Sequence, residues 1–371
     1  MAKELLKGNQ AVAEAAVRAG LQAYFGYPIT PQTELLEWLA QRMPELGRAF
    51  VQAESELGAI NMVYGAACTG VRVMTSSSSP GTSLMMEGLS YIAGTEVPTV
   101  LVDVMRGGPG LGNLAPSQGD YKQMVHGGGH GDYKPIVLAP ASVQESIDLM
   151  VEAFDLAEYY KNIVVLLTDG SIGQMMEPAE LPPMQPIKKR DFDWAVNGEP
   201  GRPRRRLSSI RIDPVQEEET NMRLMKRWLE AKQKEVRYKE YYMDDAKIAV
   251  VGFGSAGRMA LSGVRAARAE GIPVGIVRPI SLSPFPDELL YDLAGKVDKI
   301  LVVEMSSGQM LDDILLAVQN RTQVEFYGRM GGMVALPDEI YNEIKRVANA
   351  PAASSHEHPR DLWLKRTLLQ N

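Results

Sequence analysis

The feature that most constrains the fold of this chain is an alternation of short apolar segments with helical patterns over roughly its first 170 residues. The apolar segments at 21–25, 71–75, 97–105 and 163–167 have the length of buried strands, and helical periodicity separates them. The segment 97–105 is long and mostly apolar, which favours a central position in a parallel sheet. This alternation is typical of a doubly wound parallel α/β sheet, whose ligands bind outside the carboxyl ends of the strands.

Changes in composition divide the 371 residues into three parts. Residues 1–185 carry the alternating pattern, residues 186–245 form a proline-rich linker and a charged helix at about 217–241, and residues 246–371 form a second, smaller α/β domain. The polar tail at 348–358 is expected to be flexible. No apolar run approaches the ~20 residues that span a bilayer and no signal-peptide core is present, so we expect a cytoplasmic protein with no membrane partner.

Charge and cysteine content exclude several classes of function. With 39 basic and 46 acidic residues and a net charge of −7, the chain has no general attraction to nucleic acid. Cys68 is the single cysteine, which excludes an iron–sulfur cluster held by this chain alone. No metal site is expected, because His126 and His130 flank three loop glycines and Asp169 lacks the sequence context of a magnesium and diphosphate motif.

The motif GYPITP at residues 26–31 lies between an apolar segment and a helical pattern that begins near Gln32. Each proline disfavours helical backbone angles in the residue before it, so Tyr27 and Thr30 should be extended. Pro31 suits the first position of a helix, with Thr30 as its N-cap. The motif is therefore either a well-capped helix start or a helix N-terminus that receives a substrate carboxylate.

Two charged residues stand at the ends of apolar elements. Glu56 is in the first turn of an apolar helix, where it either interacts with the helix dipole or exchanges a proton with a bound heterocycle. Arg106 ends the strand 97–105, where it is either a solvated loop residue or a bidentate clamp for a carboxylate. The glycine-rich loop 107–133 that follows is too long for a simple connector and indicates a functional or partner-held segment.

The segment GFGSAG at 252–257 matches a dinucleotide-binding fingerprint between a strand and a helix. The next strand ends in Arg278-Pro279 and lacks the acidic residue that binds the ribose hydroxyls. Packing of a strand against a helix is the simpler interpretation of these glycines. A nicotinamide-dependent oxidoreductase nevertheless remains one alternative, and a non-catalytic scaffold whose glycine loops hold partners is another.

Four motifs in order, GYPITP at 26–31, ESE at 54–56, VDVMRGGP at 102–109 and RPI at 278–280, resemble the alpha subunit of 2-oxoacid:ferredoxin oxidoreductases. The resemblance covers nearly the whole chain and matches domains I and II of pyruvate:ferredoxin oxidoreductase. It implies a pyrimidine-type thiamine-enzyme domain followed by a smaller transketolase-like α/β domain. It also implies conversion of a 2-oxoacid and coenzyme A to acyl-CoA and carbon dioxide, with electrons passing to ferredoxin in anaerobic metabolism.

The resemblance assigns roles to five residues. Thr30 and Arg106 would bind the substrate carboxylate, and Tyr27 and Ile29 would line the same pocket. Glu56 would hydrogen-bond the aminopyrimidine ring of thiamine diphosphate and act in catalysis. Glu54 is a competing carboxylate, but Glu56 stands in the family's position ahead of the small-residue helix.

The resemblance also implies partners. Thiamine diphosphate would be shared with a beta subunit, and Mg²⁺ and [4Fe-4S] clusters would be held by partner subunits. A gamma subunit, a ferredoxin-like delta subunit and an external ferredoxin are expected in the hetero-oligomer, with coenzyme A as cosubstrate.

Three parts of the glycine-rich loop, residues 107–113, 116–121 and 127–133, are most similar to the branched-chain type, which implies 3-methyl-2-oxobutanoate as substrate. No lysine or arginine follows Arg106 in this loop before Lys122. A 2-oxoglutarate:ferredoxin oxidoreductase alpha subunit is the alternative, because a partner subunit could supply the missing charge.

Overall fold

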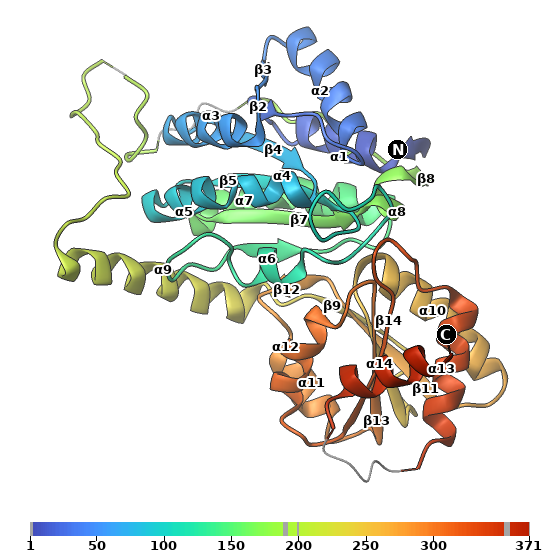
Figure 1. Cartoon of the computed structure of the whole chain (residues 1–371). Coiled ribbons are helices and arrows are strands. Elements are labelled where there is room, and N and C mark those ends of the chain that lie inside the picture. Colours follow the sequence, from blue (N-terminus) through green and yellow to red (C-terminus); the bar gives the residue numbers. More distant parts are fainter. Residues whose placement is uncertain (1–2, 188–191, 199, 352–356, 371) are drawn as a thin grey trace.

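The computed structural model describes residues 3–187, 192–198, 200–351 and 357–370, which form two α/β units, each built on its own sheet (Figure 1). The basic triplet at 188–190 and part of the expected flexible tail, residues 352–356, lie outside the described residues. No helix in the described ranges is long and apolar enough to cross a membrane.

The larger sheet has seven strands in the order β12-β6-β7-β5-β4-β2-β3. Its strands are β2 (Ala23–Gly26), β3 (Ala49–Gln52), β4 (Val73–Ser77), β5 (Thr99–Met105), β6 (Ile136–Leu138), β7 (Ile163–Asp169) and β12 (Ser281–Ser283). All neighbours pair in parallel except β12, which is antiparallel to β6. The predicted central position of β5 is confirmed, because it lies between β4 and β7 and every one of its residues is buried.

Helices cover both faces of this sheet (Figure 1). They are α1 (Gly8–Arg18), α2 (Thr33–Glu45), α3 (Glu56–Cys68), α4 (Ser79–Leu84), α5 (Met86–Thr95), α6 (Tyr121–Val125), α7 (Val143–Tyr160) and α8 (Gly170–Gln174). The apolar residues of α1, α2 and α7 form one core with one face, and those of α3 and α5 pack on the other. A separate two-stranded ribbon pairs β1 (Glu4–Lys7) with β8 (Met176–Ala179).

The smaller unit is a five-stranded sheet in the order β14-β13-β10-β11-β9. Its strands are β9 (Tyr238–Tyr241), β10 (Ile248–Val251), β11 (Val274–Pro279), β13 (Lys299–Glu304) and β14 (Gln323–Gly328). Its helices are α10 (Gly254–Ala269), α11 (Asp287–Leu293), α12 (Gln309–Val318), α13 (Pro337–Asn349) and α14 (Pro359–Gln370). The two sheets exchange strands near residue 246, since β9 precedes it but joins the smaller sheet, and β12 follows it but joins the larger one.

The charged helix is shorter than the sequence predicts. The helix α9 covers Pro214–Lys234, and the remainder of the predicted span becomes β9. Residues 238–241 pair with β11, and the carbonyl oxygen of Arg237 accepts hydrogen bonds from the main-chain N–H groups of Ile280 and Ser281, so sheet pairing replaces helical bonds there. Beyond the expected tail, α14 packs on β14 with Trp363 edge-on to Phe326 at a centroid distance of 5.1 Å.

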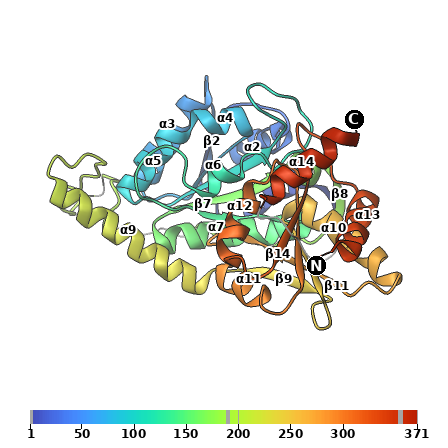
Figure 2. The ribbon, with the colours of Figure 1, turned by 60° about the horizontal axis from the view of Figure 1, so that its bottom comes forward.

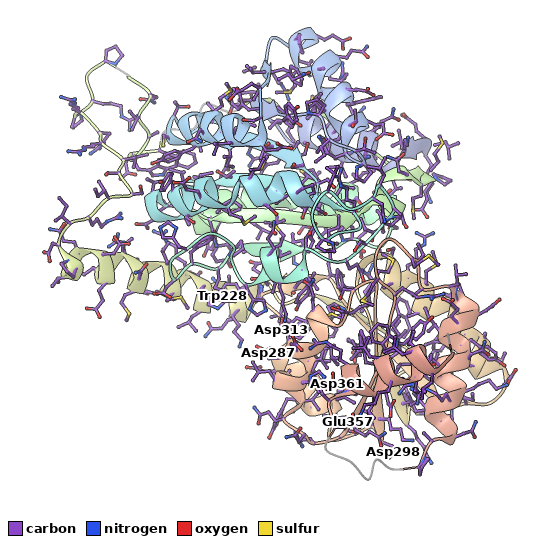
Figure 3. The ribbon with its side chains drawn as sticks, in the orientation of Figure 1. Trp228, Asp287, Asp298, Asp313, Glu357 and Asp361 are labelled. Atoms are coloured by element: carbon purple, nitrogen blue, oxygen red, sulfur yellow. The ribbon has the colours of Figure 1, made fainter. Side chains whose placement is uncertain are left out.

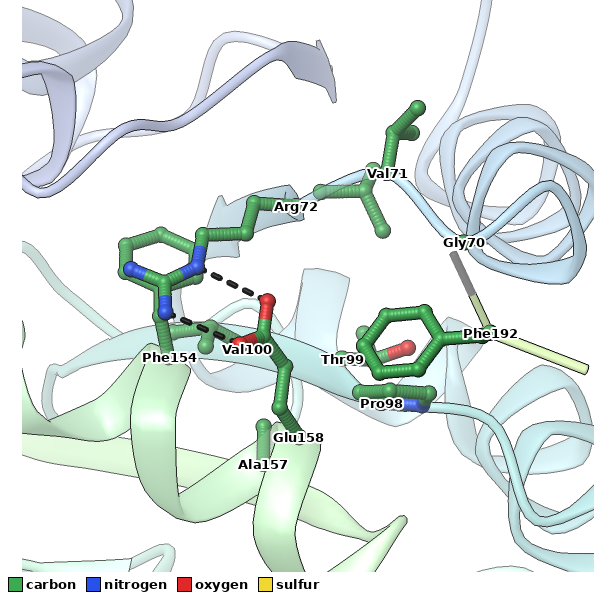
Figure 4. Close-up of a pocket in the computed structure, with 11 residues that line it drawn as sticks. Gly70, Val71, Arg72, Pro98, Thr99, Val100, Phe154, Ala157, Glu158 and Phe192 are labelled. Atoms are coloured by element: carbon green, nitrogen blue, oxygen red, sulfur yellow. Dashed lines mark hydrogen bonds and ion pairs between the residues drawn. The ribbon is translucent and has the colours of Figure 1, made fainter. Parts of the chain in front are cut away.

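The buried side chain of Arg72, just before β4, forms hydrogen bonds with neighbouring helices (Figure 4). Its Nε and Nη2 donate to the two carboxylate oxygens of Glu158 at 2.8 and 2.9 Å, and its Nη1 donates to the carbonyl oxygen of Ala19 at 2.6 Å. The pocket around this group holds only about 10 Å³, too little for more than a water molecule. This site is therefore structural.

Candidate functional site

Polar side chains at the carboxyl ends of β2 and β4 form a buried hydrogen-bonded chain. The hydroxyl groups of Tyr24 and Ser76 lie 2.7 Å apart, and Ser76 Oγ donates to Gln32 Oε1 at 2.8 Å. Gln32 Nε2 donates in turn to the carbonyl oxygen of Tyr27 at 3.0 Å. These contacts fix the GYPITP segment on the sheet edge, as its position after a strand predicts.

The helix start predicted for this segment is wrong in detail. Helix α2 begins at Thr33, and its N-cap residue is Gln32, without a side-chain cap, instead of Thr30. The N–H group of Gln32 donates a hydrogen bond to the carbonyl oxygen of Ile29 at 3.0 Å, so residues 29–32 form a turn before the helix. Thr30 is exposed at this turn, and Tyr27 and Ile29 are partly buried beside it.

Arg106 is buried at the end of β5 and is not a solvated loop residue. Its Nη1 donates to the carbonyl oxygen of Thr30 at 2.8 Å, and its Nη2 donates to that of Leu111 at 3.1 Å. No described residue accepts from its buried Nε. The main chain therefore orients the guanidinium group and leaves part of its donor capacity free.

Ser79 connects Arg106 to the start of α4. Its hydroxyl accepts from the N–H group of Arg106 at 3.0 Å and lies 2.5 Å from Asp120 Oδ2. Ser79 has a φ of +23°, in a region that L residues rarely adopt, and such strain is most often found at functional sites.

Glu56 lies on the other side of this segment, at the first turn of α3. Ser55 caps the helix through a 3.1 Å hydrogen bond from the N–H group of Gly58, and the Glu56 side chain is buried with 5% of its surface exposed. A Cβ atom at Gly81 would come within 2.3 Å of Glu56 Oε1 and 2.2 Å of Ser77 Oγ. The Glu56 carboxylate thus packs against the main chain of Gly81, where any side chain would displace it, whereas the competing Glu54 is exposed.

The Glu56 side chain is 5% exposed, no hydrogen bond joins its carboxylate to the described residues, and its oxygens keep some contact with solvent. A largely buried carboxyl group that no protein group contacts, with its oxygens still reachable, is suited to a ligand that supplies the missing hydrogen bond. Residues 77–81, from the end of β4 into α4, lie between Glu56 and Arg106, because Gly81 packs against Glu56 and Ser79 accepts a hydrogen bond from the N–H group of Arg106. Arg106 in turn donates to the carbonyl oxygen of Thr30.

A buried pair of acidic residues, Asp103 and Asp120, contacts the start of α4. Asp103 Oδ1 accepts from Thr82 Oγ1 at 3.1 Å, and no described donor reaches Asp103 Oδ2. Burial, reinforced by the charge of Asp120, raises the pKa of Asp103 well above its usual range, and burial also raises the pKa of Asp120. Two neighbouring buried carboxyl groups resist full ionisation, and the larger rise in pKa is that of Asp103.

A cleft of about 570 Å³ opens beside Arg106, between the glycine-rich loop and the smaller unit. The larger unit lines it with Ser79, Pro80, Ser83, Arg106, Gly108, Pro109, Gly110, Ser117, Gly119, Asp120 and Gln123, and the smaller one with Met305, Ser306, Ser307, Gln309, Met330 and Gly331. Sequence reasoning missed the contribution of the smaller unit. Residues 306–308, Ser-Ser-Gly, begin two residues after Glu304, the last residue of β13, which is the position where parallel strands present ligand-binding groups.

The GFGSAG segment holds the two units together. The N–H group and the hydroxyl of Ser255, at the start of α10, donate to Asp169 Oδ2 at 3.4 and 2.6 Å. Gln118 adds a second contact, donating to the carbonyl oxygen of Phe253 and accepting from the N–H group of Met305, both at 2.9 Å. The helix N-terminus that would bind a dinucleotide phosphate is therefore taken by a carboxylate of the same chain.

Asp169 also caps α8 through the N–H group of Ser171 at 2.9 Å, and burial raises its pKa. Within the ranges that the structure describes, no group of three or more histidine, cysteine, aspartate or glutamate side chains is arranged to hold a metal ion.

Family comparison matches residues 14–244 to pyruvate flavodoxin/ferredoxin oxidoreductase, thiamine diphosphate-binding, and residues 246–340 to pyruvate:ferredoxin oxidoreductase core domain II. The chain therefore belongs to the pyruvate flavodoxin/ferredoxin oxidoreductase family. Its curated relatives are subunits of 2-oxoacid oxidoreductases, so it is an oxidoreductase subunit that acts within a complex. The resemblance predicted from the four motifs is confirmed, and neither a nicotinamide enzyme nor a scaffold accounts for these matches.

The chain is 51% identical over 348 residues to ketoisovalerate oxidoreductase subunit VorB of Methanothermobacter thermautotrophicus, a match that covers 94% of this chain and 99% of the relative. It is 37% identical over 366 residues to 2-oxoglutarate synthase subunit KorA of Methanothermobacter marburgensis, covering 91% of this chain and 97% of the relative. The branched-chain type is thus the more similar of the two.

Among solved structures, the 2-oxoglutarate:ferredoxin oxidoreductase from Magnetococcus marinus with 2-oxoglutarate, coenzyme A and succinyl-CoA bound matches with a TM-score of 0.84 at 27% identity. That match covers 94% of this chain and 65% of the solved chain. A split gene transketolase matches with a TM-score of 0.55 at 12% identity, covering 92% of this chain and 98% of the other, which shows the fold alone. The predicted thiamine-enzyme fold class is confirmed.

Proposed function

We propose that this chain binds the 2-oxoacid and the aminopyrimidine ring of thiamine diphosphate in a ketoisovalerate:ferredoxin oxidoreductase, which converts 3-methyl-2-oxobutanoate and coenzyme A to acyl-CoA and carbon dioxide. The observation that carries the proposal is the convergence of partnerless Glu56 and oriented Arg106 on one segment, residues 77–81. The 51% identity to a ketoisovalerate oxidoreductase subunit supports the choice of substrate.

Glu56 fits the cofactor. Thiamine diphosphate supplies, when bound, the carbanion that attacks the 2-oxo carbon. Glu56 would hold a ring nitrogen by a hydrogen bond and exchange a proton with it as a positioned acid–base group. Its burial, the lack of a described partner and the bare backbone at Gly81 all suit this role.

Arg106 and Thr30 fit the substrate carboxylate. The guanidinium group is held in one plane by two main-chain oxygens, and a planar guanidinium group recognises carboxylates well. Thr30 provides one of these main-chain oxygens and is itself exposed, with Tyr27 and Ile29 beside it. These side chains would orient the oxo group of the substrate.

The charge of the cleft favours a substrate with one carboxylate. Among the described residues that line it, Arg106 is the only cation, and Asp120 is the one carboxyl group. The second carboxylate of 2-oxoglutarate would enter without a cation from this chain, and burying such a charge unpaired is unfavourable. The isopropyl group of 3-methyl-2-oxobutanoate has no such cost.

The partners are part of this proposal. A beta subunit would hold the diphosphate, Mg²⁺ and a [4Fe-4S] cluster, and gamma and ferredoxin-like delta subunits would complete a cytoplasmic complex that reduces external ferredoxin. The single cysteine supports this division, because the clusters need several thiolates. The full-length chain alone, supplied with thiamine diphosphate, coenzyme A and an electron acceptor, is therefore expected to be inactive, and appreciable turnover would contradict the division.

Glu56→Gln in the assembled complex tests the assignment. Since a positioned acid–base group contributes about 10²–10⁴-fold, kcat should fall by that factor while the complex still assembles. Glu54→Gln is the matched control, because this exposed carboxylate lies two residues away, and it should retain turnover. Near-normal activity of Glu56→Gln would transfer the role to another residue.

A further inference from the structure

Helix α9 has an apolar stripe on the side that faces away from its own protein. Val215, Met222 and Leu229 are 60%, 67% and 58% exposed and follow one another at intervals of seven residues. A seven-residue interval places side chains on one side of a helix. Figures 1 and 2 both show α9 along the outside of the molecule, in agreement with the exposed fractions of these three side chains.

The opposite side of α9 accounts for its attachment. Thr220 and Ala231 are buried there, and Leu224 and Trp228 pack against the cores. Lys232 Nζ donates to Asp287 Oδ2 at 2.7 Å, near the end of the helix where Trp228 lies (Figure 3). The exposed stripe is thus not needed to hold α9 in place, and three large apolar side chains in a row indicate an interaction surface.

The charges along the helix are distributed unevenly. Glu217, Glu218 and Glu219 stand in its first half, and Arg223, Lys226 and Arg227 stand in its second. Beside the stripe, Glu218 and Lys226 are exposed, and among the described residues Lys226 has only a longer-range electrostatic interaction, with Glu230, which helps lower the pKa of that carboxyl group. They lie four residues before and four residues after Met222, while Val215 and Leu229 lie seven residues before and after it.

We propose that the outer face of α9 pairs in antiparallel orientation with α9 of a second copy of this chain. A two-fold axis at Met222 places Val215 of each copy against Leu229 of the other. It also places Glu218 against Lys226 of the other copy, so the same surface is complementary to itself in shape and in charge. A parallel arrangement would put like charges opposite one another.

Chemical crosslinking of the complex assembled with its partner subunits tests the geometry. Met222→Cys lies on the axis, so a short bismaleimide should join two copies of this chain. Val215→Cys alone should give no such product, whereas a mixture of Val215→Cys and Leu229→Cys chains should. Wild-type chain is the control, because burial raises the pKa of Cys68 to about 11 and makes it a poor thiol nucleophile.

Charge exchange tests the same pairing without a crosslinker. Glu218→Lys and Lys226→Glu should each weaken association of the two copies about three- to tenfold in analytical ultracentrifugation, since exposed pairs contribute little individually but occur twice across a two-fold axis. The double variant should restore the wild-type value. A crosslink from Met222→Cys to a different subunit, or none although a monofunctional maleimide labels the thiol, would overturn the proposal. Failure of the double variant to restore association would also overturn it.

Discussion

Arg106 Nη1 donates a 2.8 Å hydrogen bond to the main-chain carbonyl oxygen of Thr30, which is 76 residues away in the sequence. The contact joins the carboxyl end of β5 to the segment that follows β2. Two residues that we predicted to bind the substrate carboxylate are thus brought together, and the main chain of Thr30 orients the guanidinium group of Arg106.

We expect Arg106→Lys to lower kcat/KM about 10- to 100-fold, because hydrogen bonds to charged groups contribute about 1.5–3 kcal/mol and lysine cannot contact Thr30, Leu111 and a carboxylate together. Steady-state kinetics of the assembled complex measure this. Arg48→Lys is the matched control, since Arg48 also donates to two main-chain oxygens, those of Val17 and Leu21, but lies outside the cleft. Equal effects of the two changes would contradict a substrate role.

Gly81→Ala should abolish most activity without preventing folding. The added Cβ would meet Ser77 Oγ at 2.2 Å and Glu56 Oε1 at 2.3 Å, so the carboxyl group must move. Gly65→Ala at an exposed position of α3 is the control, because nothing lies within 4 Å of its Cβ, and it should stabilise the helix by about 0.5–1 kcal/mol with activity retained. Turnover and thermal unfolding of both variants check this, and an active Gly81→Ala enzyme would place Glu56 outside the chemistry.

The acidic pair predicts a pH dependence of stability. Folding raises the pKa of Asp103. Its contribution to the free energy of unfolding is therefore complete below the ordinary Asp pKa of about 3.9 and is lost as pH rises through the raised pKa. The side chain of the Asp103→Asn variant is neutral at every pH, so the variant does not lose this contribution. The Tm of the variant minus the Tm of the wild type should therefore increase between about pH 5 and about pH 8. A constant or decreasing difference for Asp103→Asn would show that Asp103 is ionised in the folded chain.

Gln118 should be a main determinant of how the two units are held together. Gln118→Ala removes partners from the buried main-chain groups of Phe253 and Met305, and each orphaned group costs about 1–3 kcal/mol. The free energy of unfolding from denaturant titration measures the loss. Gln41→Ala, which removes only an exposed contact with Glu45 in α2, should be nearly neutral, and comparable losses would contradict the role of Gln118.

Features encoded over a few residues could be predicted from the sequence. The central strand β5, the capped start of α3 with Glu56 in its first turn, and Arg106 at a strand end all follow from local patterns that packing then reinforces. The resemblance of four motifs added the family and the candidate site residues.

Features that depend on distant partners could not be predicted. The N-cap position of α2 is taken by Gln32, whose side chain accepts a hydrogen bond from Ser76, 44 residues away, so Thr30 is not the cap that its residue type suggests. The docking of Ser255 on Asp169 joins residues 86 positions apart, which no local pattern encodes. The same holds for β12, whose three residues leave the smaller unit to pair with β6.

The ratio of kcat/KM for 3-methyl-2-oxobutanoate to that for 2-oxoglutarate, measured on the assembled complex, tests the central claim most directly. With Arg106 as the only cation among the described residues lining the cleft, 3-methyl-2-oxobutanoate should be preferred by about tenfold or more, the cost of leaving one charged group without a good partner. Equal values, or a preference for 2-oxoglutarate, would contradict the account.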